Sequence, residues 1–278
     1  MTAAPPRPAV PRPAAVQLYS LREAAAADFP AVLSQVASMG YAGVEPAGLH
    51  GHPAPAVRRL LADLGLRVAS SHGPMPDTDE GRAQLEEQAE IGSPTCFVSL
   101  GADWFSSPER LERAADAFAA GTEAAHAMGM TLGYHNHWWE LEGELGGRKA
   151  YDAWLDALAE RDLASAPLEV DLYWARVAGE DLVALLGRLG SRVTHLHVKD
   201  GPATHEDPMV AVGSGTLDIP AALGASPHVL WHIVELDRCA TDMAGAVGAS
   251  LAYLVGAGLS SGRPGAGQPG GAEATVPA

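Results

Sequence analysis

The sequence Gly133-Tyr134-His135-Asn136-His137-Trp138-Trp139-Glu140 is a short apolar run that ends in potential metal ligands. The same pattern returns in three later segments, Val170 to Trp174, His195 to Asp200 and Ile233 to Asp237. Nitrogen and carboxylate donors mixed in this way suit a divalent ion such as Mn, Zn, Co or Fe. The four segments therefore predict successive strand ends that direct polar groups toward one place.

Strand and helix patterns alternate along most of the chain. Apolar residues at three-to-four spacing, as in Phe29, Val32, Leu33 and Val36, indicate helices. Each run ends at a glycine that suits the left-handed position closing a helix, at Gly40, Gly65, Gly92, Gly129 and Gly190. The strand candidates are Ala15 to Leu21, Gly43 to Pro46, Arg67 to Ser71, Thr95 to Leu100, Thr131 to His135, Leu168 to Leu172, Val193 to Val198 and Leu230 to Leu236. Eight strands alternating with helices predict an α/β fold of the (β/α)8 TIM-barrel type.

A doubly wound open sheet is the rival fold. It is disfavoured because Tyr19-Ser20-Leu21-Arg22 follows the first strand, where a G-x-G-x-x-G turn would be expected. A chain of 278 residues with 47% hydrophobic content can bury one large core, so we expect a single domain over residues 14–259. Residues 1–13 and 260–278 are rich in Pro, Ala and Gly, and we expect both to be disordered extensions.

Charge and composition narrow the possible partners. The net charge of −16, with only 18 Lys and Arg residues, argues against a nucleic-acid surface. The chain has no signal-peptide core and no membrane-spanning run, which favours a cytoplasmic protein without a membrane partner. Cys96 and Cys239 lie in apolar contexts without CxxC spacing, so we expect buried thiols. A small neutral or cation-chelating substrate fits this composition, and a homo-oligomer remains possible.

In a TIM barrel, the active site lies at the carboxyl ends of the strands. Ten of the eleven histidines fall at such ends or in the loops just beyond them, and only His126 sits within a helix. The polar residues expected at this face are Glu45, His50, His72, His135, Asn136, His137, Glu140, Asp171, His195, His197, Lys199, Glu235 and Asp237. His195 and His197 alternate with apolar residues, so both are expected to point into the barrel.

Several segments together resemble the xylose isomerase-like barrels, a family that includes sugar phosphate isomerases/epimerases, inosose dehydratases, ketose 3-epimerases and the endonuclease IV type of DNA repair enzyme. The resemblance rests on six segments, Gln17 to Arg22, Gly43 to Glu45, the YHNH segment with Glu140, His195 to Asp200, Gly213 to Asp218, and Val234-Glu235. It implies the same barrel fold and a sugar or cyclitol substrate. It is specific for the superfamily and not for one reaction.

The resemblance also implies a metal site. Family members hold one divalent metal through a carboxylate after strand five, an Asp on strand six, a His on strand seven and a Glu on strand eight. By position, the last three are Asp171, His197 and Glu235. A gapless count from Gly129 places His135 where ketose epimerases have their Glu, so either His135 or Glu140 supplies the first ligand. Mn is the favoured ion, with Zn, Co, Fe and Mg as alternatives.

Such a site can stabilise the enediolate formed when a proton leaves the carbon beside a carbonyl. We therefore expect a metal-dependent sugar isomerase or epimerase of carbohydrate metabolism, with Glu140, Glu235 or His135 as the base. The expected substrate contacts are Glu45, His72, His137, Lys199 and Trp138. A lyase or hydrolase acting by β-elimination on an inosose or 3-keto-glycoside is the alternative, and a non-catalytic sugar-binding barrel is the second. The Gly213 to Asp218 loop could cradle a phosphate.

Overall fold

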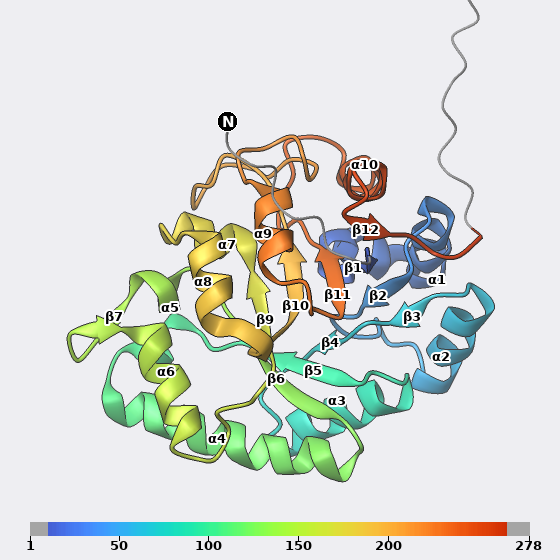
Figure 1. Ribbon diagram of the computed structural model, residues 1–278. Coiled ribbons are helices and arrows are strands. Elements are labelled where there is room, and N and C mark those ends of the chain that lie inside the picture. Colours follow the sequence, from blue (N-terminus) through green and yellow to red (C-terminus); the bar gives the residue numbers. More distant parts are fainter. Residues whose placement is uncertain (1–10, 266–278) are drawn as a thin grey trace, which may run out of the picture.

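The computed structural model describes residues 11–265. Its sheet follows the strand order β3-β2-β1-β11-β10-β9-β6-β5-β4, in which every pairing is parallel (Figure 1). The strands are β1 (Arg12–Gln17), β2 (Gly43–Glu45), β3 (Arg67–Val68), β4 (Ser71–His72), β5 (Thr95–Val98), β6 (Thr131–His135), β9 (Leu168–Asp171), β10 (Val193–Val198) and β11 (Trp231–Val234). The path starts at β3 and ends at β4, which are consecutive segments separated by Ala69 and Ser70. Together they form the third strand of a (β/α)8 TIM barrel, as the sequence predicts.

The helices follow the strands and surround the ring (Figure 1). They are α1 (Arg22–Met39), α2 (Ala54–Asp63), α3 (Asp79–Glu90), α4 (Pro108–Ala127), α5 (Trp139–Glu142), α6 (Ala150–Ala159), α7 (Leu172–Val177), α8 (Leu182–Leu189), α9 (Ile219–Ala225) and α10 (Met243–Gly256). Short 3-10 turns occupy Leu18–Leu21, Ala102–Phe105 and Gly190–Arg192. A small antiparallel hairpin, β7 (Glu144–Leu145) with β8 (Arg148–Lys149), projects beside α6.

Helix ends follow the signals in the sequence. Gly40, which follows α1, has φ +98°, and the other four glycines that end the apolar runs also have positive φ. Ser107 caps α4 by accepting a hydrogen bond from the Arg110 amide at 3.3 Å. Local sequence therefore sets where the helices stop and the strands begin.

The first strand begins earlier than the sequence indicates. It ends at Gln17, because Leu18–Leu21 turns into a 3-10 helix in which the Gln17 side chain accepts from the Tyr19 amide. The ordered body is also longer than residues 14–259. Strand β12 (Ser260–Ser261) pairs with β1, and the Arg263 guanidinium donates to the carbonyls of Leu64 and Ala37. The outer parts of both predicted extensions, residues 1–10 and 266–278, lie outside the described residues.

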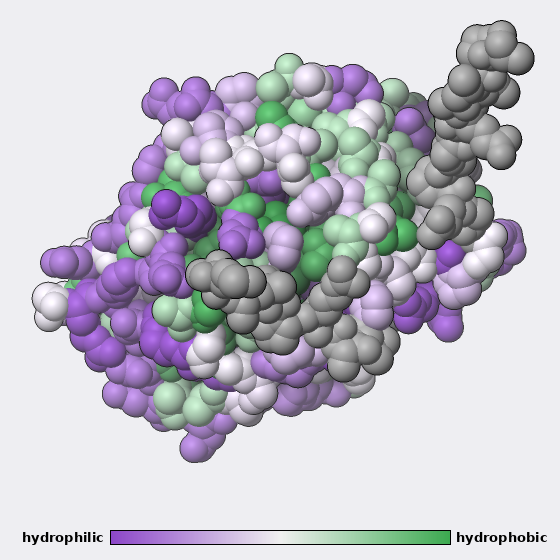
Figure 2. Space-filling model, turned by 45° about the horizontal axis from the view of Figure 1, so that its top comes forward, coloured by the Kyte–Doolittle hydropathy of each residue, from purple (hydrophilic) through white to green (hydrophobic). Residues whose placement is uncertain are grey.

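Most apolar side chains pack between the helices and the outer wall of the barrel. A second, smaller cluster lies inside the barrel and comprises Ala15, Ala42, Ala69, Trp231 and Ile233. On the face shown in Figure 2, apolar residues reach the surface mainly across the middle, bordered by hydrophilic ones. Cys96 is buried as expected, but Cys239 is only half-buried. Among the described residues, no helix is long and apolar enough to cross a membrane.

Candidate active site

Three adjacent strands bring Asp171, His197 and Glu235 together. Asp171 ends β9, His197 is the partner of Asp171 in the register of β10, and Glu235 directly follows β11. One ligand atom from each side chain lies within 4.8 Å of the other two, and all three residues are buried. The sequence predicted this group, which we call the outer triad, as metal ligands.

The outer triad is a mixed set of nitrogen and carboxylate donors. Asp171 and Glu235 are buried carboxylates at the ends of the strands that flank His197, and Glu235 Oε2 lies 2.8 Å from His197 Nδ1. Donors of this type are those that Mn, Zn, Co and Fe accept, and one ligand atom from each side chain already lies close to the other two. The residues present therefore fit such an ion.

Lys199 lies beside the outer triad and is almost fully buried. Its Nζ is 2.9 Å from Asp171 Oδ2, 2.6 Å from Glu235 Oε2 and 2.9 Å from Asp237 Oδ2. Burial opposes the charged amine, but these three carboxylates outweigh it and raise the pKa of Lys199 well above its ordinary value. Burial likewise raises the pKa of Asp171 to about 6, with Lys199 opposing the shift. Lys199 is thus a fixed positive charge facing three acids.

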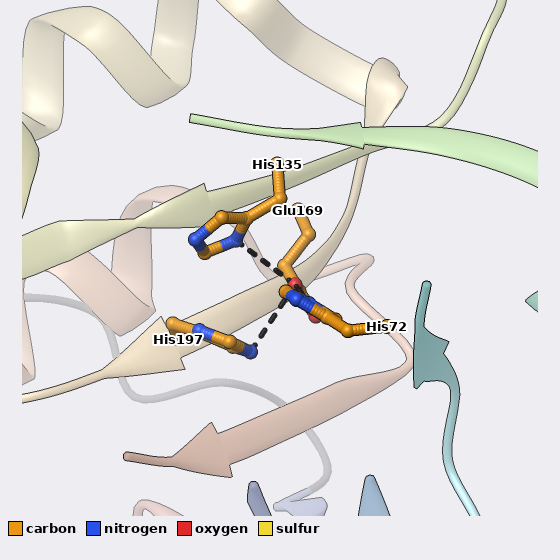
Figure 3. Close-up of side chains that lie close together, drawn as sticks. All are labelled: His72, His135, Glu169 and His197. Atoms are coloured by element: carbon orange, nitrogen blue, oxygen red, sulfur yellow. Dashed lines mark hydrogen bonds and ion pairs between the residues drawn. The ribbon is translucent and has the colours of Figure 1, made fainter. Parts of the chain in front are cut away.

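A second cluster, which we call the inner cluster, lies deeper in the barrel and comprises His72, His135, Glu169 and His197 (Figure 3). Glu169 Oε2 is the common centre, 2.5 Å from His72 Nε2, 3.0 Å from His135 Nδ1 and 3.1 Å from His197 Nε2. Burial acts to raise the pKa of Glu169, but His197 and His72 outweigh it and hold that pKa well below its ordinary value.

Sequence reasoning missed Glu169. A signal was present, because Glu169 precedes Asp171 by two residues on one strand and therefore shares its inward face. Strand registry confirms the position, since Glu169 pairs with His195 on β10 and with His135 on β6. Glu169 lies one layer below a predicted metal ligand, so the pattern of residues at strand ends does not include it.

Glu45 lies beside the inner cluster and is completely buried. Its carboxylate accepts hydrogen bonds from Ser70 Oγ at 2.5 Å, Gln17 Nε2 at 2.8 Å and His197 Nε2 at 2.6 Å. The sequence predicted a substrate contact here. Instead, the structure places the Glu45 side chain among protein donors, behind His197.

The two candidates for the strand-five ligand differ in what they contact. Both oxygens of Glu140 are engaged, one by the Tyr134 hydroxyl at 2.7 Å and the other by the His137 amide at 3.0 Å. Burial raises the pKa of Glu140 to about 7. His135 instead directs Nε2 to within 4.0 Å of Asp171 Oδ2, and burial lowers its pKa to about 3. His135 is therefore neutral near pH 7 and has a lone pair beside the outer triad.

A pocket of about 290 Å³ opens above the outer triad. It is lined by Gln17, Tyr19, Ala47, His72, Ser99, His135, His137, Lys199, Glu235 and Asp237. Of the predicted substrate contacts, His72, His137 and Lys199 line this pocket, whereas Glu45 and Trp138 do not. Of the predicted bases, Glu235 and His135 line it, and Glu140 does not.

Trp138 belongs to an aromatic group at the rim of the barrel. Its ring centroid lies 4.6 Å from those of Trp139 and Trp174, and 5.5 Å from that of His205. Lys199 Nζ lies 5.7 Å from the Trp174 ring. The sequence predicted a substrate contact for Trp138, but these contacts place its ring among the aromatic residues of the rim.

The loop that contains Gly213 to Asp218 already surrounds an anion of the protein itself. The Asp200 carboxylate accepts hydrogen bonds at 2.9–3.2 Å from the backbone amides of Gly201, Gly213, Gly215 and Leu217. Because these donors are taken by Asp200, they are not free to hold a substrate phosphate.

The fold and the convergent carboxylates and imidazoles define a TIM barrel with a candidate metal-assisted active site. A family model, described as the xylose isomerase-like TIM barrel, matches residues 33–225. The chain therefore belongs to this family. Among curated protein sequences, none matches the chain significantly.

Solved structures of the same fold cover nearly the whole chain. A sugar phosphate isomerase/epimerase from Parabacteroides distasonis is 21% identical, with a TM-score of 0.68 over 91% of this chain and 98% of that one. L-ribulose 3-epimerase is 15% identical, with a TM-score of 0.68 over 89% and 94%. The IOLI protein, solved with a bound zinc atom, is 11% identical, with a TM-score of 0.66 over 89% and 98%. At these identities, the likeness establishes the fold alone.

Proposed function

We propose that this protein is a divalent-metal-dependent sugar isomerase or epimerase, as the sequence predicts. The observation that carries the proposal is the outer triad, in which two buried carboxylates and an imidazole converge beside a pocket lined by titratable groups. Asp171, His197 and Glu235 would hold the ion, with Mn favoured. The names of the structural neighbours, which include epimerases, support a sugar or cyclitol substrate.

His135 is the better candidate for the fourth ligand. Its Nε2 faces Asp171 across 4.0 Å and makes no hydrogen bond of its own among the contacts described, whereas Glu140 already accepts from Tyr134 and His137. A bound ion would supply Lewis acidity that stabilises negative charge on the oxygens of an enediolate. Glu140 would then act indirectly, by fixing the backbone between His135 and Trp139.

The residues that line the pocket can move the proton. Burial tends to raise the pKa of Glu235, but Lys199 and His197 outweigh it and hold the pKa well below its ordinary value, so Glu235 is ionised and can accept a proton. The proton leaves the carbon beside the carbonyl, and its electron pair passes to the carbonyl oxygen. Return of the proton to the neighbouring carbon gives isomerisation, and return to the opposite face gives epimerisation. Lys199 and His72 can hold the substrate oxygens.

Metal analysis tests the ligand assignment. We expect wild-type protein to bind about one divalent ion per chain. Asp171→Ala and Glu235→Gln should lose that ion, because each removes a charged ligand. Asp237→Asn is the matched control, since Asp237 contacts Lys199 outside the outer triad and should leave the ion bound. Full occupancy in both ligand variants would refute the assignment.

Proton exchange tests the reaction. Metal-loaded protein incubated in deuterium oxide with a panel of keto-sugars and cyclitols should place deuterium on the carbon beside the carbonyl of a true substrate. His135→Asn should lose both metal and exchange, while Glu140→Gln should keep the metal. A protein that binds sugars without any exchange would be a binding protein and not an enzyme.

A lyase acting through the same enediolate is the second candidate. The name of one structural neighbour, a probable 3-DHS dehydratase, supports it. Product analysis separates the two reactions, since elimination yields an unsaturated product and isomerisation conserves the molecular formula.

A further inference from the structure

Neither Glu45 nor Glu169 lines the pocket, and each contacts a histidine of the site. Figure 3 shows Glu169 among the imidazoles of His72, His135 and His197. Glu45 Oε2 is 2.6 Å from His197 Nε2, and Glu169 Oε2 is 3.0 Å from His135 Nδ1. In each imidazole, the other ring nitrogen faces the outer triad. His197 Nδ1 lies 2.8 Å from Glu235 Oε2, and His135 Nε2 lies 4.0 Å from Asp171 Oδ2.

A neutral imidazole carries one N–H and one lone pair, so the hydrogen bond made by one nitrogen decides which nitrogen can bind a metal. Ionised carboxylates accept and do not donate. His197 must therefore carry a proton on Nε2, toward Glu45. Its Nδ1 faces the Glu235 carboxylate at 2.8 Å, so Nδ1 is also protonated when no ion is bound, and that is the proton which an ion would displace. His135 must carry its proton on Nδ1 and present a lone pair at Nε2. The two rings thus use opposite nitrogens.

The inner cluster is arranged as a set of hydrogen bonds around one oxygen. The nitrogens His72 Nε2, His135 Nδ1 and His197 Nε2 converge on Glu169 Oε2 at 2.5, 3.0 and 3.1 Å. That oxygen fills the place where a second metal ion would have to lie.

Both carboxylates are placed where an ionised group is costly, since each is completely buried. Donors from Ser70 and Gln17 support Glu45. Glu169 Oε1 has no hydrogen-bond partner, so the imidazoles that contact Oε2 are the chief stabilisation of its charge. An acid buried in this way, with histidines as its main partners, fits a role in orienting those histidines.

We propose that Glu45 and Glu169 are positioning residues that hold a proton on His197 Nε2 and on His135 Nδ1, so that the opposite nitrogen of each ring is the one left to bind an ion. The inference deepens the proposed function and rests on it. It adds Glu45 and Glu169 to the residues that support metal binding, and neither of them lines the pocket. Carboxylate partners of metal-binding histidines typically contribute about 10–100-fold to metal affinity.

Nitrogen NMR of the imidazoles tests the tautomers directly, in both metal-free and Zn²⁺-loaded protein. We expect the proton of His135 on Nδ1 in both states. We expect His197 to carry protons on both nitrogens in metal-free protein and on Nε2 alone in Zn²⁺-loaded protein. A proton on His135 Nε2, or a Zn²⁺-loaded His197 without a proton on Nε2, would overturn the proposal. A protein with the expected tautomers that takes up no Zn²⁺ would support the hydrogen-bond assignment and refute the proposed function, so the two failures are distinguishable.

Metal affinity, measured by competition with a chelator, is the second readout. Glu169→Gln and Glu45→Gln should each weaken Zn²⁺ binding by about 10–100-fold. His195→Gln is the matched control. His195 is buried on β10 like His197, but its ring contacts the Thr194 hydroxyl and the Ala69 carbonyl and neither glutamate. It should change affinity by less than about threefold.

Two further results would count against the proposal. Unchanged affinity in both glutamine variants would overturn it. Two ions per wild-type chain, one of which is lost in Glu169→Gln, would also overturn it by showing that the inner cluster is itself a metal site. If Glu169→Gln does not fold, the Zn²⁺ affinity of Glu45→Gln and the imidazole tautomers of the wild-type protein still test the proposal.

Discussion

The two ends of the same barrel are filled in opposite ways. Toward the amino ends of the strands, Ala15, Ala42 and Ala69 leave room for the indole of Trp231, which packs with Ile233. Toward the carboxyl ends, the interior holds the outer triad, the inner cluster and Lys199. One end buries apolar surface, and the other buries ionised side chains, each of which needs an oppositely charged partner. Residues that stabilise the fold and residues of the candidate active site therefore lie at different ends of the barrel.

Removing the buried cation should produce the largest effect. In metal-free protein, Lys199→Met leaves Asp171 and Glu235 without their ammonium partner, so we expect a loss of about 3–5 kcal/mol in the free energy of unfolding at pH 7. Added Mn²⁺ should stabilise the variant more than wild type, because the ion no longer competes with Nζ for the same oxygens. Urea unfolding with and without Mn²⁺ measures both.

The chain contains only one other lysine, Lys149, which makes an exposed pair with Glu180. Lys149→Met is therefore the matched control and should change stability by less than about 1 kcal/mol. Weaker Mn²⁺ binding in Lys199→Met would mean that Lys199 supports the ion instead of competing with it.

A substitution at the opposite end should cost stability without changing the chemistry. Trp231→Ala leaves a cavity beneath three alanines, and we expect a loss of about 3–5 kcal/mol. Metal content and turnover per folded molecule should stay near wild type. Thermal unfolding and metal analysis on one preparation check this, and a loss of metal in the folded variant would show that the two ends are coupled.

Glu140→Gln should change how stability depends on pH. Burial raises the native pKa of Glu140 from 4.5 to about 7, so between these values the native state holds more protons than the unfolded state. Stability contributed by this group therefore falls as pH rises through that window. We expect metal-free Glu140→Gln to be more stable than wild type by about 1–3 kcal/mol at pH 8, with the advantage absent at pH 4.

The exposed Glu144→Gln is the control for this experiment and should follow the wild-type curve. Urea unfolding across pH 4–8 is the measurement. An advantage of Glu140→Gln that grows toward acid pH would contradict a raised pKa for the native carboxyl group.

The smallest effects are expected at the carboxyl terminus. Deleting residues 266–278, which are mostly Gly, Pro and Ala, should change the free energy of unfolding by less than about 0.5 kcal/mol. Deleting from residue 260 should cost about 1 kcal/mol or more, because it removes the pairing of β12 with β1 and two hydrogen bonds of Arg263. Equal melting curves for both truncations would show that β12 contributes nothing.

The sequence predicted the barrel because its signals are local. Apolar periodicity and a glycine after each helix are set within a few residues, and the strands from Thr131 to His135 and from Val193 to Val198 match the structure at both ends. The first strand was placed too late, because the 3-10 turn after Gln17 depends on that residue's own side chain.

The site was predictable only where residues at strand ends carry recognisable chemistry. Asp171, His197 and Glu235 follow from alternation and position, and the structure brings them together. Glu169 contacts histidines on β6 and β10, and only the order of the strands in the sheet shows that these strands lie beside β9. That order depends on contacts between residues far apart in the sequence. The engagement of Glu45 by Ser70 and Gln17 likewise joins three different strand ends.

The loop tied down by Asp200 is ordered by the chain itself. Four backbone amides bind a carboxylate of the same chain, so the loop keeps its conformation without any ligand. A ligand that contacted this loop would spend no binding free energy on ordering it.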